Sequence, residues 1–390
     1  MQIVKSNSAL IAVDNSFFKF TDSKFNFLQL IQSSQLSVNR NNISTKSIGS
    51  DLSNRSQFLN PDVIFDISYF QRNDFWNERM LGFNFINFPN QQVSIFDNLL
   101  KDLSNNEAFI LMSDLDNNDL VNDIKKNGFN ENFITIALDS IFLDKYSISY
   151  TLNSIALVSC TFSCSNFNIS KLLKENNIFK FRNYAKNNTD ITSESINAFY
   201  DLSREYPYKH LIYSTKYFNI TNDIDNEKIS GINIQTLLDG AINKFDLSIE
   251  MNRNKNYFFE SGASVASRKI IPPIKYSLSI SGISTGFVEG DIEKIKQNNL
   301  FTFIVSVGKE NDEDFSYYEM VFENLVIENF SYSLDLQGFL NYNISFSGEI
   351  SKNSGFRIRS KYTSNILIKQ AISSDSKKIY SSDGYNILTF

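Results

Sequence analysis

The residues best able to do chemistry in this chain are few and widely spaced. The single histidine, His210, cannot by itself complete a usual zinc site, and it stands at no spacing typical of a Ser-His-Asp triad. The stretch Ser281–Gly286, SGISTG, contains the Gly-x-Ser-x-Gly pattern of a serine nucleophile, but no histidine follows it. We therefore expect structural roles for these residues, and no enzymatic activity.

The two cysteines, Cys160 and Cys164, are four residues apart in an alternating stretch. In a strand they share one face at a separation of roughly 13 Å. That distance is too long for a disulfide or for a shared metal ion. The spacing predicts two reduced cysteines in a core.

Two acidic clusters are the remaining candidates for a site. The first lacks the glycine at the sixth position and the glutamate at the twelfth that a calcium-binding loop of the EF-hand type needs. Three interpretations stay open: a solvated loop, an acidic pore lining and a calcium site. We expect no metal or other cofactor. The candidate residues are Asp114, Asp116 and Asp119 in one cluster and Glu310, Asp312 and Asp314 in the other.

Length and charge limit the possible classes of protein. The chain has 390 residues, 42% of them hydrophobic, so two domains with buried cores are expected. A net charge of -6 argues against a groove that grips nucleic acid by neutralising phosphates, although DNA in transit over the surface is compatible with it. The first residues, MQIVKSNSAL, lack the pattern of a signal peptide, and no apolar run is long enough to span a bilayer. We expect no membrane anchor and assembly in a cytoplasm.

The sequence contains an ordered internal repeat. FLDKYSISYTLNSIALVSCTFSC at 142–164 matches VIENFSYSLDLQGFLNYNISFSG at 326–348 without a gap. Upstream, LSVNRNN from Leu36 matches LSIEMNRNK from Leu247, and PDVIFDISY from Pro61 matches PPIKYSLSI from Pro272. The matches follow the same order in both halves, which favours a duplicated unit.

The repeated stretches predict strands. Apolar residues alternate with serine and threonine along 146–152 and 158–164, which indicates a hairpin of half-buried strands. Short helical patterns at 96–103 and 292–297 predict one helix flanking each unit. The expected fold class is mainly β (α+β), with two tandem β-sandwich or curled-sheet domains.

The domain boundaries follow from this pattern. We expect a first β domain over 1–168, a partly helical connector over 169–235, a second β domain over 236–350 and a C-terminal extension over 351–390. The helical character of the connector is read from SKLLKENN and SESINAFYDLSREY. The extension contains FRIRSKY, which could be a strand added to a neighbour's sheet edge or a capping tail.

Two long polar loops, 40–58 and 252–268, occupy matching places in the two halves. Connections of this length are uncommon unless they have a function or are disordered. We therefore expect both loops to have a function. Their basic residues are the candidates for contacts: Arg40, Lys46, Arg55, Arg253, Lys255 and Arg268.

The runs LSIEMNRNKNYFFESGASVASRKIIPPIKYSLSIS and VFENLVIENFSYSLDLQGFLNYNISFSG resemble the tail tube (major tail) proteins of tailed bacteriophages. The similarity covers about 30–165 and 240–350. It implies a β-sandwich with a flanking helix whose sheets associate side by side into a ring of six around a DNA channel. Because each chain carries two such units, we expect homotrimeric, pseudo-hexameric rings that stack into a tube. The basic residues of the two long loops are then expected to stack the rings, and the two acidic clusters to face the lumen.

The resemblance also implies a place and partners. We expect a virion protein of the phage tail, assembled in the host cytoplasm, that contacts itself and other tail proteins and lets DNA pass without specific binding. One alternative is another tail component of the same fold, such as a baseplate hub, a distal ring or a tube terminator. A second is a carbohydrate-binding β-sandwich for host attachment, for which Trp76 is the only tryptophan platform.

Overall fold

The computed structural model is built almost entirely from strands, which confirms the predicted mainly-β fold. The described part of the chain contains one helix, α1 (Trp76–Met80). The described residues are 9–14, 25–39, 42–44, 56–58, 62–72, 75–81, 93–94, 107–113, 133–171, 173–175, 178–181, 189–191, 218–221, 240–258, 264–284, 300–307, 318–334, 338–351, 355–360, 378–380 and 387–389.

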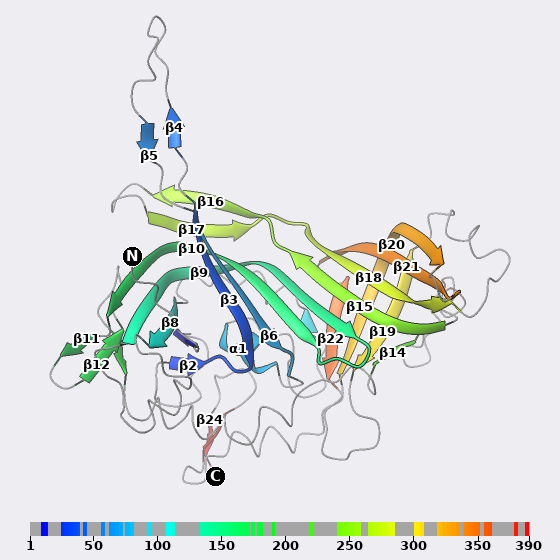
Figure 1. Cartoon of the computed structure of the whole chain (residues 1–390), viewed down its shortest axis with the longest axis horizontal. Coiled ribbons are helices and arrows are strands. Elements are labelled where there is room, and N and C mark those ends of the chain that lie inside the picture. The colour runs from blue at the N-terminus through cyan, green and yellow to red at the C-terminus, as the bar shows by residue number, and fades with distance from the viewer. Residues whose placement is uncertain are drawn as a thin grey trace, which may run out of the picture.

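One sheet of fifteen strands dominates the molecule (Figure 1). Its ten-strand path runs, in spatial order, through β14 (Phe218–Thr221), β19 (Phe301–Val307), β20 (Tyr318–Leu334), β21 (Leu340–Ile350), β18 (Ile274–Ser284), β15 (Gly240–Glu250), β9 (Phe133–Thr151), β10 (Leu157–Lys171), β6 (Asp62–Phe70) and β3 (Ile31–Asn39). Off this path lie β1 (Ala9–Asp14), β2 (Phe25–Phe27), β7 (Val93–Ser94), β8 (Glu107–Ser113) and β22 (Phe356–Ser360).

The sheet contains the same strand order twice. In the first half β3, β6, β10 and β9 are successive neighbours, and in the second half β15, β18, β21 and β20 are. Outside them, β8 pairs with β9 and β1 with β8, as β19 pairs with β20 and β14 with β19. The strands that match in sequence therefore hold matching places in the sheet.

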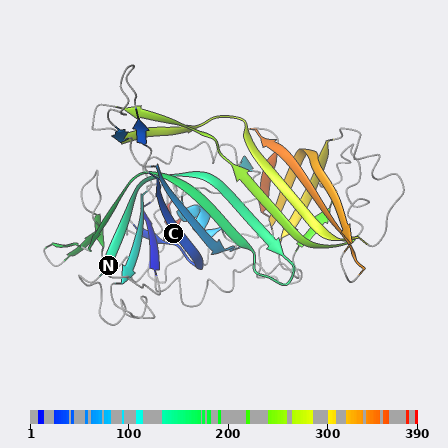
Figure 2. The ribbon, with the colours of Figure 1, turned by 45° about the horizontal axis from the view of Figure 1, so that its top comes forward.

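The two halves join head to tail. The last strand of the first series, β9, pairs antiparallel with the first strand of the second series, β15. We call this pairing the internal junction. Figure 2 shows the sheet running without interruption through β9 and β15. Ser147 lies opposite Ser248, and Lys145 lies opposite Glu250.

The alternation of buried and partly exposed residues explains why these segments form strands. In β6, Val63, Phe65, Ile67 and Tyr69 are all buried, whereas the residues between them are partly exposed. The predicted hairpin of β9 and β10 is confirmed by their antiparallel register. Its turn includes Asn153 at φ 58, a left-handed backbone that asparagine tolerates better than most residues.

The second half curls into two layers. β20 pairs with β19 and β22 along its first half and with β21 along its second half. Aromatic rings fill the space between the layers: Phe322 lies 4.8 Å from Phe356 and 5.9 Å from Tyr276, measured between ring centroids. A further ring of the same core, Phe245, comes from β15 at the internal junction, 6.0 Å from Phe322. The core therefore continues across the two halves.

Several described segments differ from the sequence-based expectations. Residues 170–177 were expected to be helical, but β10 continues to Lys171 and β11 (Leu173–Glu175) follows it. Backbone pairing overrides the local helical pattern, because β10 pairs with β9 as far as Lys171 opposite Ile134, and β11 pairs with β12. The described parts of the expected connector are all strands, which also include β12 (Ile178–Phe181) and β13 (Thr189–Ile191).

Two further strands lie in segments assigned to the connector and to the C-terminal extension. β14 pairs with β19, and β22 pairs with β20 and β7 of the same chain. The strand of the FRIRSKY stretch is therefore paired with β20 and β7 of its own chain. The expected helices at 96–103 and 292–297 lie outside the described residues. β23 (Lys378–Tyr380) and β24 (Ile387–Thr389) form a separate hairpin.

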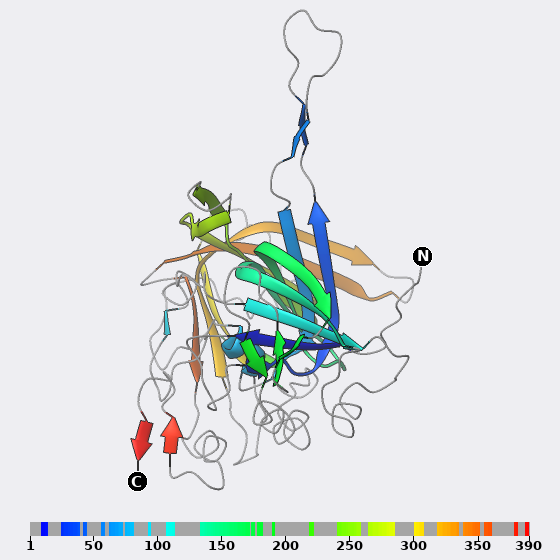
Figure 3. The ribbon, with the colours of Figure 1, turned by 90° about the vertical axis from the view of Figure 1, so that its left-hand side faces the viewer.

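The two long loops are β-hairpins, which we call the arms. The first arm pairs β4 (Asn42–Ser44) with β5 (Ser56–Phe58), and the second pairs β16 (Arg253–Phe258) with β17 (Ser264–Ile270). Each arm follows directly on the first strand of its half, β3 or β15. Both arms lie at the same end of the molecule, and Figure 3 shows the first standing well beyond the sheet.

Candidate functional site

The eight neighbouring strands from β3 to β20 have an open strand edge at each end. At one end β3 pairs only with β6 among the strands that the structure describes. At the other end β20 pairs with β21 over Val326–Leu334, and no described strand adds to the opposite edge of that segment. These are the edges that β15 and β9, at matching positions, use to pair with each other.

Apolar side chains on β3 are exposed where their counterparts in β15 are buried. Leu247 and Ile249 of β15 are 1% and 0% exposed. The matching residues of β3 are Leu36, which is half-buried, and Val38, which is 37% exposed. Burial of a Leu, Ile or Val side chain contributes about 1.5–3 kcal/mol. The internal junction thus buries an apolar row that β3 leaves partly in water.

The outer end of β20 shows the same contrast. Tyr150 of β9 is 2% exposed, whereas its counterpart Leu334 is 71% exposed. Phe330 and Tyr332 are half-buried, while the residues at their positions in β9, Tyr146 and Ile148, are buried. Exposed apolar rows along open strand edges are typical of surfaces that pair with another chain.

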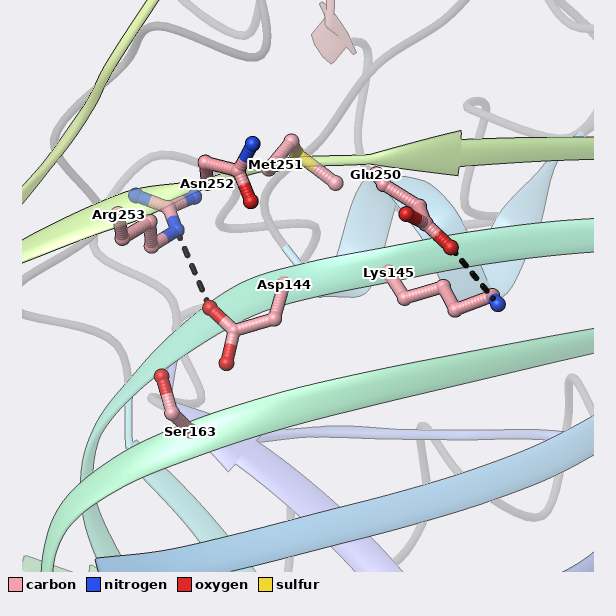
Figure 4. Close-up of a pocket in the computed structure, with 7 residues that line it drawn as sticks. All are labelled: Asp144, Lys145, Ser163, Glu250, Met251, Asn252 and Arg253. Atoms are coloured by element: carbon pink, nitrogen blue, oxygen red, sulfur yellow. Dashed lines mark hydrogen bonds and ion pairs between the residues drawn. The ribbon is translucent and has the colours of Figure 1, made fainter. Parts of the chain in front are cut away.

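A pocket of about 300 Å³ lies where the second arm leaves the internal junction (Figure 4). A bulge in β9 forms one wall: Thr161 pairs with Lys145 and Phe162 with Leu143, so Asp144 is an extra residue. The carbonyl of Asp144 accepts a hydrogen bond of 2.8 Å from the amide of Met251, the residue after β15. The bulge therefore fixes the point at which the chain turns from β15 into the arm.

Arg253, the first residue of the arm, closes this pocket. Its Nε donates to the carbonyl oxygen of Leu143 at 2.8 Å and lies 3.5 Å from a carboxylate oxygen of Asp144. The guanidinium also lies over the ring of Phe142, 5.7 Å from the centroid. The side chain of Arg253 is only 6% exposed. A charged group held this firmly positions the arm and is not displayed for binding.

The charges of the pocket cancel. Asp144 faces Arg253, and Glu250 accepts a hydrogen bond from Lys145 at 3.0 Å on the exposed rim. In the described residues, no group of three or more His, Cys, Asp or Glu side chains is placed to hold a metal ion. The arrangement is suited to fixing strand geometry.

A second polar cluster holds α1 against the sheet. The side chain of Asn77 accepts from the amide of Gln29 at 2.8 Å and donates to its carbonyl at 2.7 Å. Arg72 donates to the side chain of Gln29, and Tyr146 donates to Glu78 at 3.3 Å. All of these residues are buried. Their hydrogen bonds tie the β2–β3 turn to α1, which is a structural role.

The two cysteines lie in the core, as the alternating sequence pattern predicted. Both are free and buried, Cys160 at 1% and Cys164 at 0% exposure. Burial raises the pKa of the Cys160 thiol well above its ordinary value, against the smaller opposing effect of a hydrogen bond with the Tyr69 hydroxyl. A neutral buried thiol is a poor nucleophile. The prediction of reduced core cysteines is confirmed.

The structure describes some of the other candidate residues. Arg253 is described above, and Lys255 and Arg268 lie opposite each other in the second arm. Ser281 lies inside β18, opposite Asn343 and Lys244, and not at a strand-to-helix turn. Trp76 is 8% exposed beneath Arg72, so it offers no exposed platform for a sugar. The candidates outside the described residues are His210, Arg40, Lys46, Arg55, Asp114, Asp116, Asp119, Glu310, Asp312 and Asp314.

Asp144 was not among the predicted site residues, although the sequence contains a signal for it. Apolar positions alternate up to Leu143 and resume at Tyr146, a spacing of three that breaks the period of two. The same spacing separates Ile327 from Phe330, and there too a bulge occurs, at Glu328 between Ile327 and Asn329. A shift of phase within a strand pattern indicates a bulge.

No protein-family model matches the chain, and no curated protein matches it significantly. Among the described residues, no helix combines the length and the apolar character needed to cross a membrane. The functional conclusion therefore depends on the sheet, its edges and the arms.

Proposed function

We propose that this protein is a structural subunit that assembles with copies of itself through its sheet edges. The observation that carries the proposal is the head-to-tail internal junction, which joins β9 to β15 and leaves the matching edges of β3 and β20 at opposite ends. A heterologous contact of this kind builds a closed ring or an open filament. Closure of a ring also removes the edges, which would otherwise favour aggregation.

The particular assembly that we propose is the tail tube of a bacteriophage. The sequence resemblance supports it, together with the mainly-β fold and the two arms on one end of the molecule. The duplicated unit is part of the proposal: three chains supply six units to a ring, and rings stack through the arms into a tube. DNA passes through the lumen without specific binding, and other tail proteins contact the tube ends.

Electron microscopy of the purified protein, combined with native mass spectrometry, tests the proposal. We expect rings with threefold symmetry that stack into smooth tubes. Rings that never stack would favour a single-ring tail component of the same fold, such as a hub or terminator, and would contradict the tube. A protein that remains monomeric at high concentration would contradict self-assembly altogether.

A further inference from the structure

The internal junction provides a template for the contact between two copies. β9 and β15 pair antiparallel over seven residue pairs, from Lys244 opposite Thr151 to Glu250 opposite Lys145. The sequence matches relate β15 to β3 and β9 to β20. The template therefore specifies a register as well as a pair of strands.

We propose that β3 of one copy pairs antiparallel with the outer half of β20 in a second copy, with Ser37 opposite Ser331. Ser37 matches Ser248 and Ser331 matches Ser147 in the sequence repeat, and Ser248 pairs with Ser147 at the internal junction. Leu36 then lies opposite Tyr332, and Val38 lies opposite Phe330. The inference rests on the proposed self-assembly and identifies its contact.

The polar face supports this register. Ser37 and Ser331 alternate with the apolar residues of their strands, on the face opposite the core, as Ser248 and Ser147 do. A shift of one residue would move each apolar row to the wrong face. A shift of two would leave the pleat in phase but would displace the strands relative to the bulge.

The bulge at Glu328 marks the end of the paired segment. At the internal junction the pairing of β15 stops at Lys145, next to the Asp144 bulge, and the arm begins there. Glu328 holds the matching place on β20 and is exposed. In the proposed contact, Asn39 at the end of β3 lies opposite Asn329, so the first arm of one copy leaves β3 beside Glu328 of the next copy.

Cysteine cross-linking tests the register. Ser37→Cys and Ser331→Cys are made in separate chains, mixed under assembly conditions and oxidised; the natural cysteines are buried and should not react. We expect a disulfide-linked dimer from the mixture and none from either variant alone, because the contact is heterologous. Ser333→Cys replaces Ser331→Cys as the control that is out of register by two residues, where diagonal neighbours lie about 7–8 Å apart.

The possible results test the β3–β20 contact and the tube proposal separately. A yield at least five-fold higher with Ser331→Cys than with Ser333→Cys supports the register, and equal yields or no dimer overturn it. Tubes that form without cross-linking would contradict the β3–β20 contact and leave the tube proposal standing. Cross-linked dimers without tubes would support the contact and contradict the tube. A chain with both Ser37→Cys and Ser331→Cys should stop at a linked trimer.

Discussion

Arg253 connects the bulge of β9, the end of β15 and the second arm through one nearly buried side chain. We expect Arg253→Ala to lower the free energy of unfolding by about 1.5–3 kcal/mol, the usual contribution of a hydrogen bond from a charged group. Chemical denaturation measures this change. Hydrogen exchange at the Met251 amide, which bonds to the Asp144 carbonyl, should also accelerate.

The pocket itself offers the matched control for this variant. The ion pair of Lys145 with Glu250 lies on the rim, with side chains 47% and 64% exposed. Exposed pairs contribute about 0–1 kcal/mol. Lys145→Ala should therefore change stability by less than about 1 kcal/mol. Equal losses in the two variants would contradict the positioning role of Arg253.

The buried tyrosines predict a loss of stability in alkali. Burial raises the pKa of Tyr342 to about 12, and it raises the pKa of Tyr276 as well. In the unfolded chain these hydroxyls ionise near pH 10. The stabilisation that comes from the neutral hydroxyl of Tyr342 is therefore complete below pH 10, and it is lost as the pH rises from about 10 to 12. Denaturant midpoints measured at successive pH values check this dependence.

Two substitutions separate the contributions of these tyrosines. The hydroxyl of Tyr342 is buried with no hydrogen-bond partner among the described residues, whereas that of Tyr276 donates to the carbonyl of Glu323 at 3.1 Å. Tyr342→Phe should stabilise the protein at pH 8, with a gain that grows above pH 10. Tyr276→Phe should destabilise it at pH 8. A destabilised Tyr342→Phe protein would count against this interpretation.

At the scale of the elements, the turn before β22 depends on a glycine. Gly355 has φ +110, and a Cβ there would collide with the backbone oxygen of Glu349. We expect Gly355→Ala to cost more than about 2 kcal/mol, because left-handed backbone alone costs about 1–2 kcal/mol and the contact with Glu349 adds to it. Thermal unfolding measures the loss.

The hairpin turn before β21 provides the comparison. Gly338 has φ +84, but a Cβ there would meet no atom within 4 Å. Gly338→Ala should therefore cost only the backbone strain of about 1–2 kcal/mol. If both variants lose the same stability, the close approach to Glu349 has no energetic weight.

The strands most visible in the sequence were those with half-buried alternation. The residues from Tyr146 to Cys164 predicted a hairpin, because period two leaves one face polar. β14 was missed and the pairing of β22 was not predicted, because a strand of four or five residues carries little pattern and these two pair with distant β19 and β20. α1 has five residues, too few for a helical period.

The candidate site was harder to predict than the fold. The arms could be placed from two matching polar stretches, but their hairpin pairing depends on contacts that local pattern does not specify. The head-to-tail pairing of β9 with β15 is a long-range choice between several possible edges, and no residue type dictates it. The bulge at Asp144 was readable from the phase shift between Leu143 and Tyr146.

At the scale of the whole molecule, the open edges should control assembly without controlling the fold. We expect Val38→Lys and Leu334→Lys each to abolish rings and tubes, because a charged side chain on an edge opposes strand pairing. Their stability as monomers should change little, since both positions are exposed. Light scattering measures assembly, and circular dichroism measures the fold.

Ile169 is the control for these edge variants. It is 57% exposed and lies in β10, opposite Ile136 of β9, away from β3 and from the outer half of β20. Ile169→Lys should assemble as the unchanged protein does. If it blocks assembly as strongly as Leu334→Lys, surface charge and not the edge controls polymerisation.

The internal junction has a further consequence for how assembly depends on concentration. A contact within one chain forms at the high effective concentration that a covalent connection provides, so dilution does not break it. In the proposed ring three junctions are of this kind and three require a meeting of chains. Dilution should therefore dissociate the ring into two-unit pieces and never into single units, and any ring that the protein builds must contain an even number of units.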